Sequence, residues 1–267
     1  MIICEICRKQ NKNMNRIISK LQEPKKILSI YFSAGYPNLN DTVAIIENLE
    51  KSGVDMIEIG LPFSDPLADG PVIQASSTEA LHNGMTTKVL FEQLQNIRKS
   101  VQIPLIIMGY FNPMLQYGVE EFCKKCKEIG IDGLIIPDLP VDIYEENYKA
   151  IFEKYELFNI FLITPETTEN RIKHIDNVSN GFIYMVSSAS VTGGSADEFD
   201  LNQKEYFERI ANLNLENPQV IGFGISNKST FNQATKHAKG AIIGSVFIKN
   251  LTENGISSID KFIKNII

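Results

Sequence analysis

The chain alternates between short apolar runs and longer amphipathic segments almost from end to end. The apolar runs are rich in β-branched residues, which is typical of parallel strands covered on both faces. They comprise residues 27–32, 56–61, 105–110, 133–136, 160–164, 182–186, 220–223 and 241–247. The intervening segments predict helices over residues 41–51, 88–99, 119–129, 143–155, 169–178, 203–213, 228–238 and 257–266. Eight strands alternating with eight helices predict an α/β fold in which a parallel sheet closes into a (β/α)8 TIM barrel.

The 267 residues are sufficient for one such barrel, and no linker, repeat or low-complexity segment divides them. We therefore expect a single barrel domain over residues 16–267, preceded by a polar, poorly ordered extension over residues 1–15. An open, doubly wound sheet is the structural alternative. It would need a glycine-rich fingerprint after the first strand, and the segment 33–37 (SAGYP) does not provide one.

The charge and hydropathy of the chain exclude several classes of protein. The net charge is −6 and basic residues form no stripe, so nothing in the sequence favours nucleic-acid binding. No apolar run reaches the ~18 residues that a membrane-spanning helix needs. The first residues lack the pattern of a signal peptide, so we expect a cytoplasmic protein.

The four cysteines form two C-x-x-C pairs, which raises the possibility of a zinc site. Zinc-ribbon pairs are usually ~15–20 residues apart, whereas Cys4 and Cys7 lie far from Cys123 and Cys126 in this chain. The second pair falls within a predicted helix, where the thiols are expected to pack as small apolar groups. The three histidines do not cluster, and no lysine ends a strand where it could form a Schiff base. We therefore expect chemistry without a metal or a cofactor.

Two carboxylates follow the second predicted strand. Glu58 lies between apolar neighbours that face the helices, so its side chain points into the barrel, where burial raises its pKa. Asp69 lies in a loop stiffened by prolines, which also contains Asp65. Each carboxylate has a structural alternative, a buried Glu satisfied by a partner for Glu58 and an Asx-type turn for Asp69. Because barrel enzymes bind substrates at the C-terminal ends of their strands, the pair favours acid–base chemistry.

Glycines follow the sixth, seventh and eighth strands, in the segments 191–195, 222–226 and 244–245. Glycine lets backbone N–H groups approach an anion closely, and the last loops of this fold often bind a phosphate. Apolar side chains also surround the same end of the barrel, namely Tyr31, Tyr110, Ile136 and Leu162. The pattern therefore predicts a phosphorylated substrate with an apolar, aromatic half.

The segment 58–74, EIGLPFSDPLADGPVIQ, resembles the signature of tryptophan synthase α subunits, and the motif is long and specific. Further similarities occur at residues 112–113, 137–140, 184, 191–193, 222–226 and 240–245. The resemblance extends over about residues 15–252. It implies a retro-aldol cleavage of indole-3-glycerol phosphate to indole and glyceraldehyde 3-phosphate, in the last steps of tryptophan biosynthesis.

The resemblance also implies roles for individual residues. Glu58 is expected to act as the general acid–base group, Asp69 to hold the indole N–H, and Tyr184 to assist from the barrel wall. Thr192 is expected to order a lid and orient Asp69. The implied phosphate cradle comprises Gly193, Gly224, Ile225, Gly244 and Ser245. The implied indole pocket comprises Tyr31, Ile73, Tyr110, Ile136 and Leu162.

The implied partner is a tryptophan synthase β subunit in an α2β2 heterotetramer, which contains pyridoxal phosphate and receives the indole. The segment around Asp65 and residues 112–113 lie on the face expected to meet it. Three alternatives remain open: a free-standing indole-3-glycerol phosphate lyase, a non-catalytic activating subunit and a phosphate-sugar isomerase barrel. The Glu58–Asp69 pair disfavours the second, and the long motif disfavours the third.

Overall fold

The chain forms a nearly closed barrel of parallel strands, in a computed structural model that describes residues 14–187, 199–222 and 224–267. The strands are β1 (Ile27–Ser33), β2 (Met56–Gly60), β3 (Leu105–Met108), β4 (Gly133–Ile135), β5 (Phe158–Ile160), β6 (Leu162–Ile163), β7 (Ile183–Val186), β8 (Gln219–Gly222) and β9 (Gly240–Ile243). Their order in the sheet is β5-β4-β3-β2-β1-β9-β8-β7-β6. The two edge strands are neighbours in the chain, so the sheet curls into a ring, and the predicted TIM barrel is confirmed.

The fifth predicted strand, residues 160–164, differs from the structure. The extended segment begins earlier, at Phe158, and Phe161 divides it into β5 and β6. Strand β5 pairs with β4, whereas β6 pairs with β7. The Phe161 carbonyl accepts a hydrogen bond from the Tyr184 N–H at 2.9 Å. One bent segment therefore joins both edges of the sheet.

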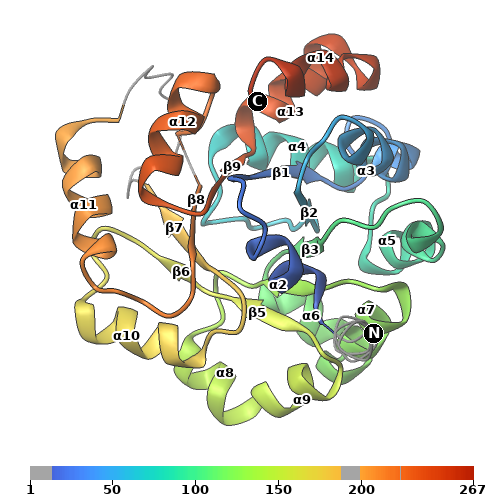
Figure 1. Cartoon of the computed structure of the whole chain (residues 1–267). Helices are drawn as coiled ribbons and strands as arrows, with labels where there is room; N and C mark the ends of the chain where they lie inside the picture. The colour runs from blue at the N-terminus through green and yellow to red at the C-terminus, as the bar shows by residue number, and fades with distance from the viewer. Residues whose placement is uncertain (1–13, 188–198, 223) are drawn as a thin grey trace, which may run out of the picture.

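Helices surround the strands as a ring (Figure 1). Those of the first half are α2 (Arg16–Leu21), α3 (Thr42–Lys51), α4 (Pro71–His82), α5 (Thr87–Leu94), α6 (Phe111–Tyr117) and α7 (Val119–Ile129). Those of the second half are α8 (Val141–Asn147), α9 (Lys149–Lys154), α10 (Glu169–Val178), α11 (Leu201–Ala211), α12 (Lys228–His237), α13 (Ser245–Asn254) and α14 (Ile259–Lys264). Three 3-10 turns are η1 (Leu39–Asp41), η2 (Ile97–Lys99) and η3 (Ile256–Ser258).

The sequence pattern missed helices α2, α4, α6 and α13. The last predicted strand, residues 241–247, was too long, because β9 ends at Ile243 and α13 begins at Ser245. Buried residues on α13 include Phe247, Ile248 and Leu251, a spacing that suits one face of a helix. An apolar run of this length does not by itself distinguish a strand from a buried helix.

Two hydrophobic layers hold the barrel together. The larger one lies between the strands and the surrounding helices, and it includes the thiols of Cys123 and Cys126 on α7. Both thiols are free and buried, so the predicted apolar packing of this pair is confirmed. The smaller layer fills the barrel interior with every second residue of the strands, among them Tyr31, Ile106 and Tyr184.

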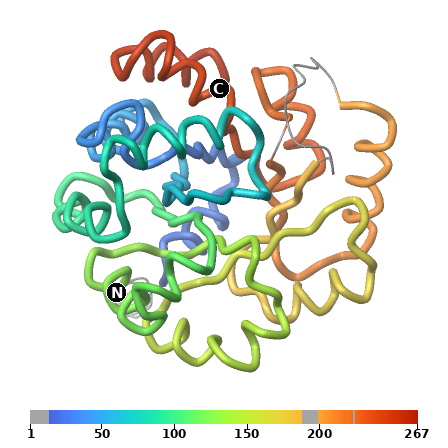
Figure 2. The backbone as a smooth tube through the Cα atoms, turned by 180° about the vertical axis from the view of Figure 1, so that it is seen from behind, coloured from blue at the N-terminus to red at the C-terminus, as the bar shows by residue number. Residues whose placement is uncertain are grey.

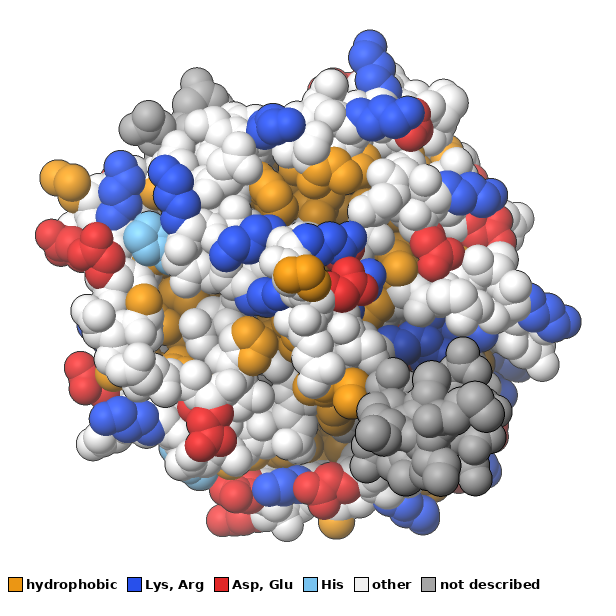
Figure 3. Space-filling model, viewed as in Figure 1, with side chains coloured by type: hydrophobic (Ala, Val, Ile, Leu, Met, Phe, Trp, Pro, Cys, Tyr) orange, Lys and Arg blue, Asp and Glu red, His pale blue; other side chains and the backbone are white. Residues whose placement is uncertain are grey.

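Helix α2 closes the N-terminal end of the barrel and lies across the middle of the view in Figure 1. The Asn15 side chain caps this helix and donates to the Asp132 carbonyl, which precedes β4, at 2.8 Å. Basic side chains gather over this face (Figure 3). Lys25, which follows α2 in the chain, pairs with Asp55 at 2.5 Å. These contacts are structural. Figure 2 shows the backbone from the opposite side of the molecule. Within the described residues, no helix is long and apolar enough to cross a membrane.

Candidate active site

Glu58 lies on β2 inside the barrel and is fully buried. Its Oε1 accepts a hydrogen bond from the Ser29 hydroxyl on β1 at 2.9 Å. Its Oε2 has no hydrogen-bond partner among the residues that the structure describes. Burial raises the pKa of Glu58 to about 8, although the Ser29 hydroxyl acts in the opposite direction. The carboxyl group is therefore a neutral acid at pH 7, with one oxygen free to exchange a proton.

Asp69 lies between β2 and α4, in a loop held against the barrel by Tyr110. The Tyr110 hydroxyl donates to Asp69 Oδ2 at 3.1 Å and accepts from the Ala68 N–H at 2.9 Å. Asp69 is only 8% exposed, and burial raises its pKa to about 6, opposed by the hydrogen bond from Tyr110. At pH 7 Asp69 is therefore an ionised carboxylate, whereas Glu58 is protonated. Environments that separate two pKa values in this way assign an acid and an anion to one site.

Two buried tyrosines lie near the carboxylates, one on β1 and one on β7. Burial raises the pKa of Tyr184 on β7 well above its ordinary value, and the charges of Glu58 and Asp69 raise it further. The pKa of Tyr31 on β1 is raised in the same way, first by burial and then by the charge of Asp69. Both phenols are therefore neutral hydrogen-bond donors. Strand register places Tyr31 directly beside Glu58.

Most of the predicted indole pocket comes together around these groups. Tyr31, Ile73 and Leu162 belong to or pack against the interior layer of the barrel. A narrow cleft is lined by Tyr31, Asp69 and Tyr110, together with Leu61, Phe63, Ser77, Met108, Gly109 and Pro137. Mostly apolar side chains beside one carboxylate are the lining that suits a flat ring whose N–H group donates to that carboxylate.

Ile136 is not part of this group. It lies beyond the end of β4 and packs in the outer layer between the strands and the helices. Its neighbour Ile135 faces the barrel interior instead. Side chains alternate between the two faces of a strand, so only one of these adjacent residues can point inward. The structure therefore brings Ile135, and not Ile136, to the interior layer.

The predicted phosphate residues lie where β8 and β9 end. Gly244 precedes α13, and Ser245 is the first residue of that helix, so free N–H groups of the first turn face this end of the barrel. Gly224 has a φ of +73° and is exposed, a backbone conformation that suits glycine. Ile225 is buried beside it. The structure thus places Gly224 and Gly244 at the ends of neighbouring strands, as the sequence indicated.

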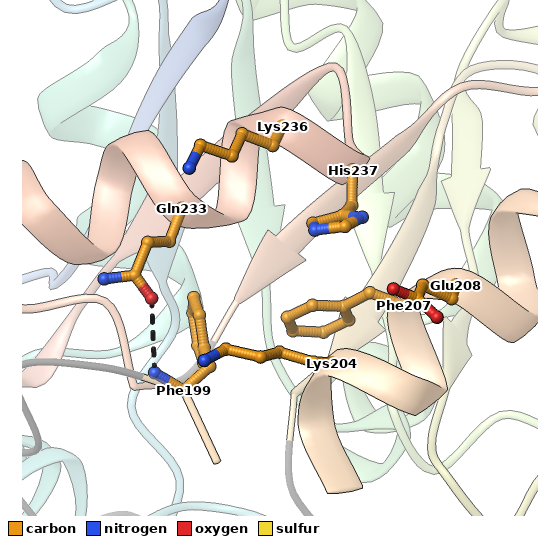
Figure 4. A pocket seen from close by; sticks show the side chains of 7 residues that line it. All are labelled: Phe199, Lys204, Phe207, Glu208, Gln233, Lys236 and His237. Atoms are coloured by element: carbon orange, nitrogen blue, oxygen red, sulfur yellow. Dashed lines mark hydrogen bonds between the residues drawn. The ribbon is translucent and has the colours of Figure 1, made fainter. Parts of the chain in front are cut away.

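Phe199 supports this region from the side of α11 and α12 (Figure 4). Its ring packs edge-on against Phe207 of α11, with 5.1 Å between the ring centroids. Its N–H donates to Gln233 Oε1 of α12 at 3.5 Å. A side chain added at Gly224 would come within 3.7 Å of the Phe199 ring. Phe199 therefore lies directly behind the exposed backbone of Gly224.

Two predicted residues, Thr192 and Gly193, lie outside the described residues, as do Cys4 and Cys7. Within the part of the chain that the structure describes, no three His, Cys, Asp or Glu side chains cluster to hold a metal ion.

Sequence reasoning missed Ser29 and the polar role of Tyr110. Ser29 could have been found, because residues 27, 29, 31 and 33 share one face of β1 and a hydroxyl is unusual within such an apolar run. Tyr110 was expected only as an apolar wall, and its position gave no sign that its hydroxyl would reach Asp69.

Comparison with known proteins agrees with this geometry. The family model for the tryptophan synthase alpha chain matches residues 18–266. The tryptophan synthase alpha chain of Flavobacterium psychrophilum is 78% identical, over 95% of this chain and 100% of that protein. The tryptophan synthase alpha chain of Phocaeicola vulgatus is 58% identical, over 90% of this chain and 93% of that protein.

Solved structures give the same result. Tryptophan synthase subunit alpha from Legionella pneumophila superposes with a TM-score of 0.86 at 31% identity, covering 95% of this chain and 97% of that one. A tryptophan synthase from M. tuberculosis in an aminoacrylate-bound form gives a TM-score of 0.83 at 28% identity. The match covers 95% of this chain and 98% of that one. The chain therefore belongs to the tryptophan synthase alpha chain family, which comprises lyases of tryptophan biosynthesis with a TIM-barrel fold.

Proposed function

We propose that the chain cleaves indole-3-glycerol phosphate to indole and glyceraldehyde 3-phosphate in a retro-aldol reaction. The observation that carries this proposal is the pairing of a protonated Glu58 with an ionised Asp69 beside a mostly apolar cleft. Neutral Glu58 gives its proton to C3 of the indole, and the resulting carboxylate takes the proton of the side-chain hydroxyl. The electrons of the broken C–C bond return to the ring, which restores the aromatic indole and leaves an aldehyde.

Asp69 and Tyr184 assist this reaction. Protonation at C3 places positive charge on the indole nitrogen, and an ionised Asp69 at hydrogen-bond distance stabilises that charge in a site from which water is excluded. Tyr184 is a neutral phenol close enough to both carboxylates for their charges to raise its pKa. The protons move between carbon, oxygen and Glu58, so the reaction needs neither a metal nor a cofactor of this chain.

The phosphate is bound in the same proposal by Gly193, Gly224, Ile225, Gly244 and Ser245. The start of α13 supports this assignment, because Gly244 caps that helix without a side-chain hydrogen bond. The first N–H groups of a helix suit an anion, and they need no basic side chain to do so. The net charge of −6 is therefore compatible with an anionic substrate.

The partner that we propose is a tryptophan synthase β subunit, which holds pyridoxal phosphate and accepts indole in an α2β2 complex. Two apolar side chains suit such an interface, since Leu67 is 90% exposed and Leu115 is 49% exposed. Leu67 lies in the Asp69 loop, and residues 112–113 lie on α6 with Leu115. A partner that binds Leu67 would act on the Ala68–Tyr110–Asp69 hydrogen bonds directly.

The same proposal includes two organisational points. Residues 16–267 form one catalytic domain that follows an N-terminal extension over residues 1–15, and the protein acts in the cytoplasm. Membership of a family of biosynthetic enzymes supports the second point.

Indole release by the purified chain, with and without a β subunit, tests the proposed function. We expect equal amounts of indole and glyceraldehyde 3-phosphate, and a kcat that rises about ten-fold or more when the β subunit is added, which corresponds to about 1.4 kcal/mol of barrier. A chain that is equally fast alone is a free-standing lyase. A chain that cleaves nothing but accelerates the β subunit is a non-catalytic activator.

The two carboxylates predict a bell-shaped pH profile of kcat/KM. Activity is expected to rise with pH through about 6, as Asp69 loses its proton, and to fall with pH through about 8, as Glu58 loses its proton. The profile of kcat/KM reports the free enzyme, which is the state to which these values apply. Steady-state cleavage from pH 5 to pH 9.5 in buffers of constant ionic strength measures both limbs. A flat profile across this range would show that neither carboxylate titrates in the reaction.

Substituting Gly244 by valine is expected to weaken phosphate binding by about ten-fold, a cost of about 1.4 kcal/mol. A Cβ at this position would lie 3.4 Å from the Tyr31 ring, which is ordinary contact, so the branches of valine have no space there. Gly244→Ala is the matched control and should retain most of the affinity. Calorimetry with glycerol phosphate measures the effect. Unchanged affinity in a folded Gly244→Val protein would show that the phosphate does not bind at Gly244.

A further inference from the structure

Ser29 is a buried polar residue to which the reaction above gives no role. We propose that Ser29 is a positioning residue, whose hydroxyl holds Oε1 of Glu58 so that the transferred proton is carried by Oε2. The inference rests on the proposed function, because it assumes that Glu58 is the acid–base group.

The geometry of the two strands supports this role. Ser29 and Glu58 are both fully buried, and the Ser29 hydroxyl donates to Oε1 at 2.9 Å. Ser29 is part of a seven-residue strand that pairs with β2 on one side and β9 on the other, so the donor is fixed in position. The second oxygen, Oε2, has no hydrogen-bond partner among the described residues. The carboxyl group therefore has one anchored oxygen and one free oxygen.

This asymmetry determines which oxygen reacts. While the Ser29 hydroxyl donates to Oε1, the proton of the neutral acid is favoured on Oε2, because a protonated oxygen is the weaker hydrogen-bond acceptor. A carboxyl group without this anchor could rotate and present either oxygen, and acid–base groups lose efficiency when their geometry is not fixed. Ser29 also stabilises the ionised form of Glu58, because a hydrogen bond donated to a carboxylate favours its charge.

The other titratable groups near Glu58 do not replace Ser29. They are Tyr31 from β1, Tyr184 from β7 and Asp69 from the loop that follows β2. Both tyrosines have raised pKa values and are neutral in the working range. Among the residues that the structure describes, no Lys, Arg or His contributes to the pKa of Glu58. The Ser29 hydroxyl thus donates the hydrogen bond that lowers the pKa of Glu58 against the effect of burial.

The pH profile of Ser29→Ala tests the inference. Removing the donor should raise the pKa of Glu58, so the alkaline limb of kcat/KM should move to higher pH, with an ionisation constant about ten-fold smaller. The plateau of kcat should fall about three-fold to ten-fold while KM changes little. Ser29→Thr, which keeps the hydroxyl, should restore the alkaline limb. Ser33→Ala removes a buried hydroxyl from the same face of the same strand, and it should leave that limb in place.

A measurement without substrate separates this inference from the proposed function. The infrared carboxyl band of Glu58, identified by its loss in Glu58→Gln, can be titrated in wild type and in Ser29→Ala. A higher titration midpoint in Ser29→Ala supports the role of Ser29 even if no protein cleaves indole-3-glycerol phosphate, in which case the proposed function alone has failed. An unchanged midpoint in a folded Ser29→Ala protein overturns the inference even if cleavage is normal in wild type.

Discussion

Replacing Glu58 with glutamine is expected to lower the rate of indole release by about 10²–10⁴-fold, the range that positioned acid–base groups contribute. Glutamine has nearly the same shape as glutamate but neither donates nor accepts a proton at working pH. The group serves twice in one turnover, first as acid and then as base, so the loss should lie toward the upper end of the range. Steady-state cleavage with a coupled assay for glyceraldehyde 3-phosphate measures it.

The Glu58→Gln substitution should not destabilise the fold. The amide oxygen can still accept the hydrogen bond from Ser29, and a neutral amide avoids the cost of ionising a buried carboxyl group. Circular dichroism and the affinity for glycerol phosphate serve as controls. Near-normal turnover by a folded Glu58→Gln protein would show that Glu58 is not the acid–base group of the reaction.

The barrel and the inward direction of Glu58 could be predicted because both follow from periodicity. Apolar runs at regular spacing indicate strands, and the alternation of side chains along β2 determines which face Glu58 occupies. Asp69 could be identified because its proline-rich loop follows that strand. These inferences need only local sequence, so the tertiary structure did not overturn them.

The parts that could not be predicted depend on contacts between distant segments. The bond from Ser29 to Glu58 depends on the register of β1 against β2, and the bond from Tyr110 to Asp69 joins residues 41 positions apart. Ile136 lies in the outer layer and Ile135 in the interior, because a shift of one residue reverses the face of a strand. The start of α13 was missed because an apolar run fits a strand or a buried helix equally well.

The exchange of Asp69 for asparagine is expected to lower kcat by about 10²–10³-fold, the loss found when one preorganised electrostatic contact to a developing charge is removed. Asparagine can still accept a hydrogen bond from the indole N–H but carries no charge to stabilise the positive ring nitrogen. The cleft is narrow and Asp69 is buried, so little water is present to replace the missing charge. Cleavage and the binding of an indole analogue, measured on the same protein, separate a loss of catalysis from a loss of affinity.

The pH profile distinguishes this explanation from a simple disturbance of the loop. Asp69→Asn should lose the acid limb near pH 6 and keep the alkaline limb near pH 8, since Glu58 is unchanged. Tyr110→Phe is the matched variant, because it keeps the Asp69 charge but removes the hydroxyl that donates to it. That hydroxyl lowers the pKa of Asp69, so its loss should move the acid limb to higher pH. An Asp69→Asn enzyme that keeps an acid limb near pH 6 would show that another group titrates there, and that Asp69 only shapes the loop.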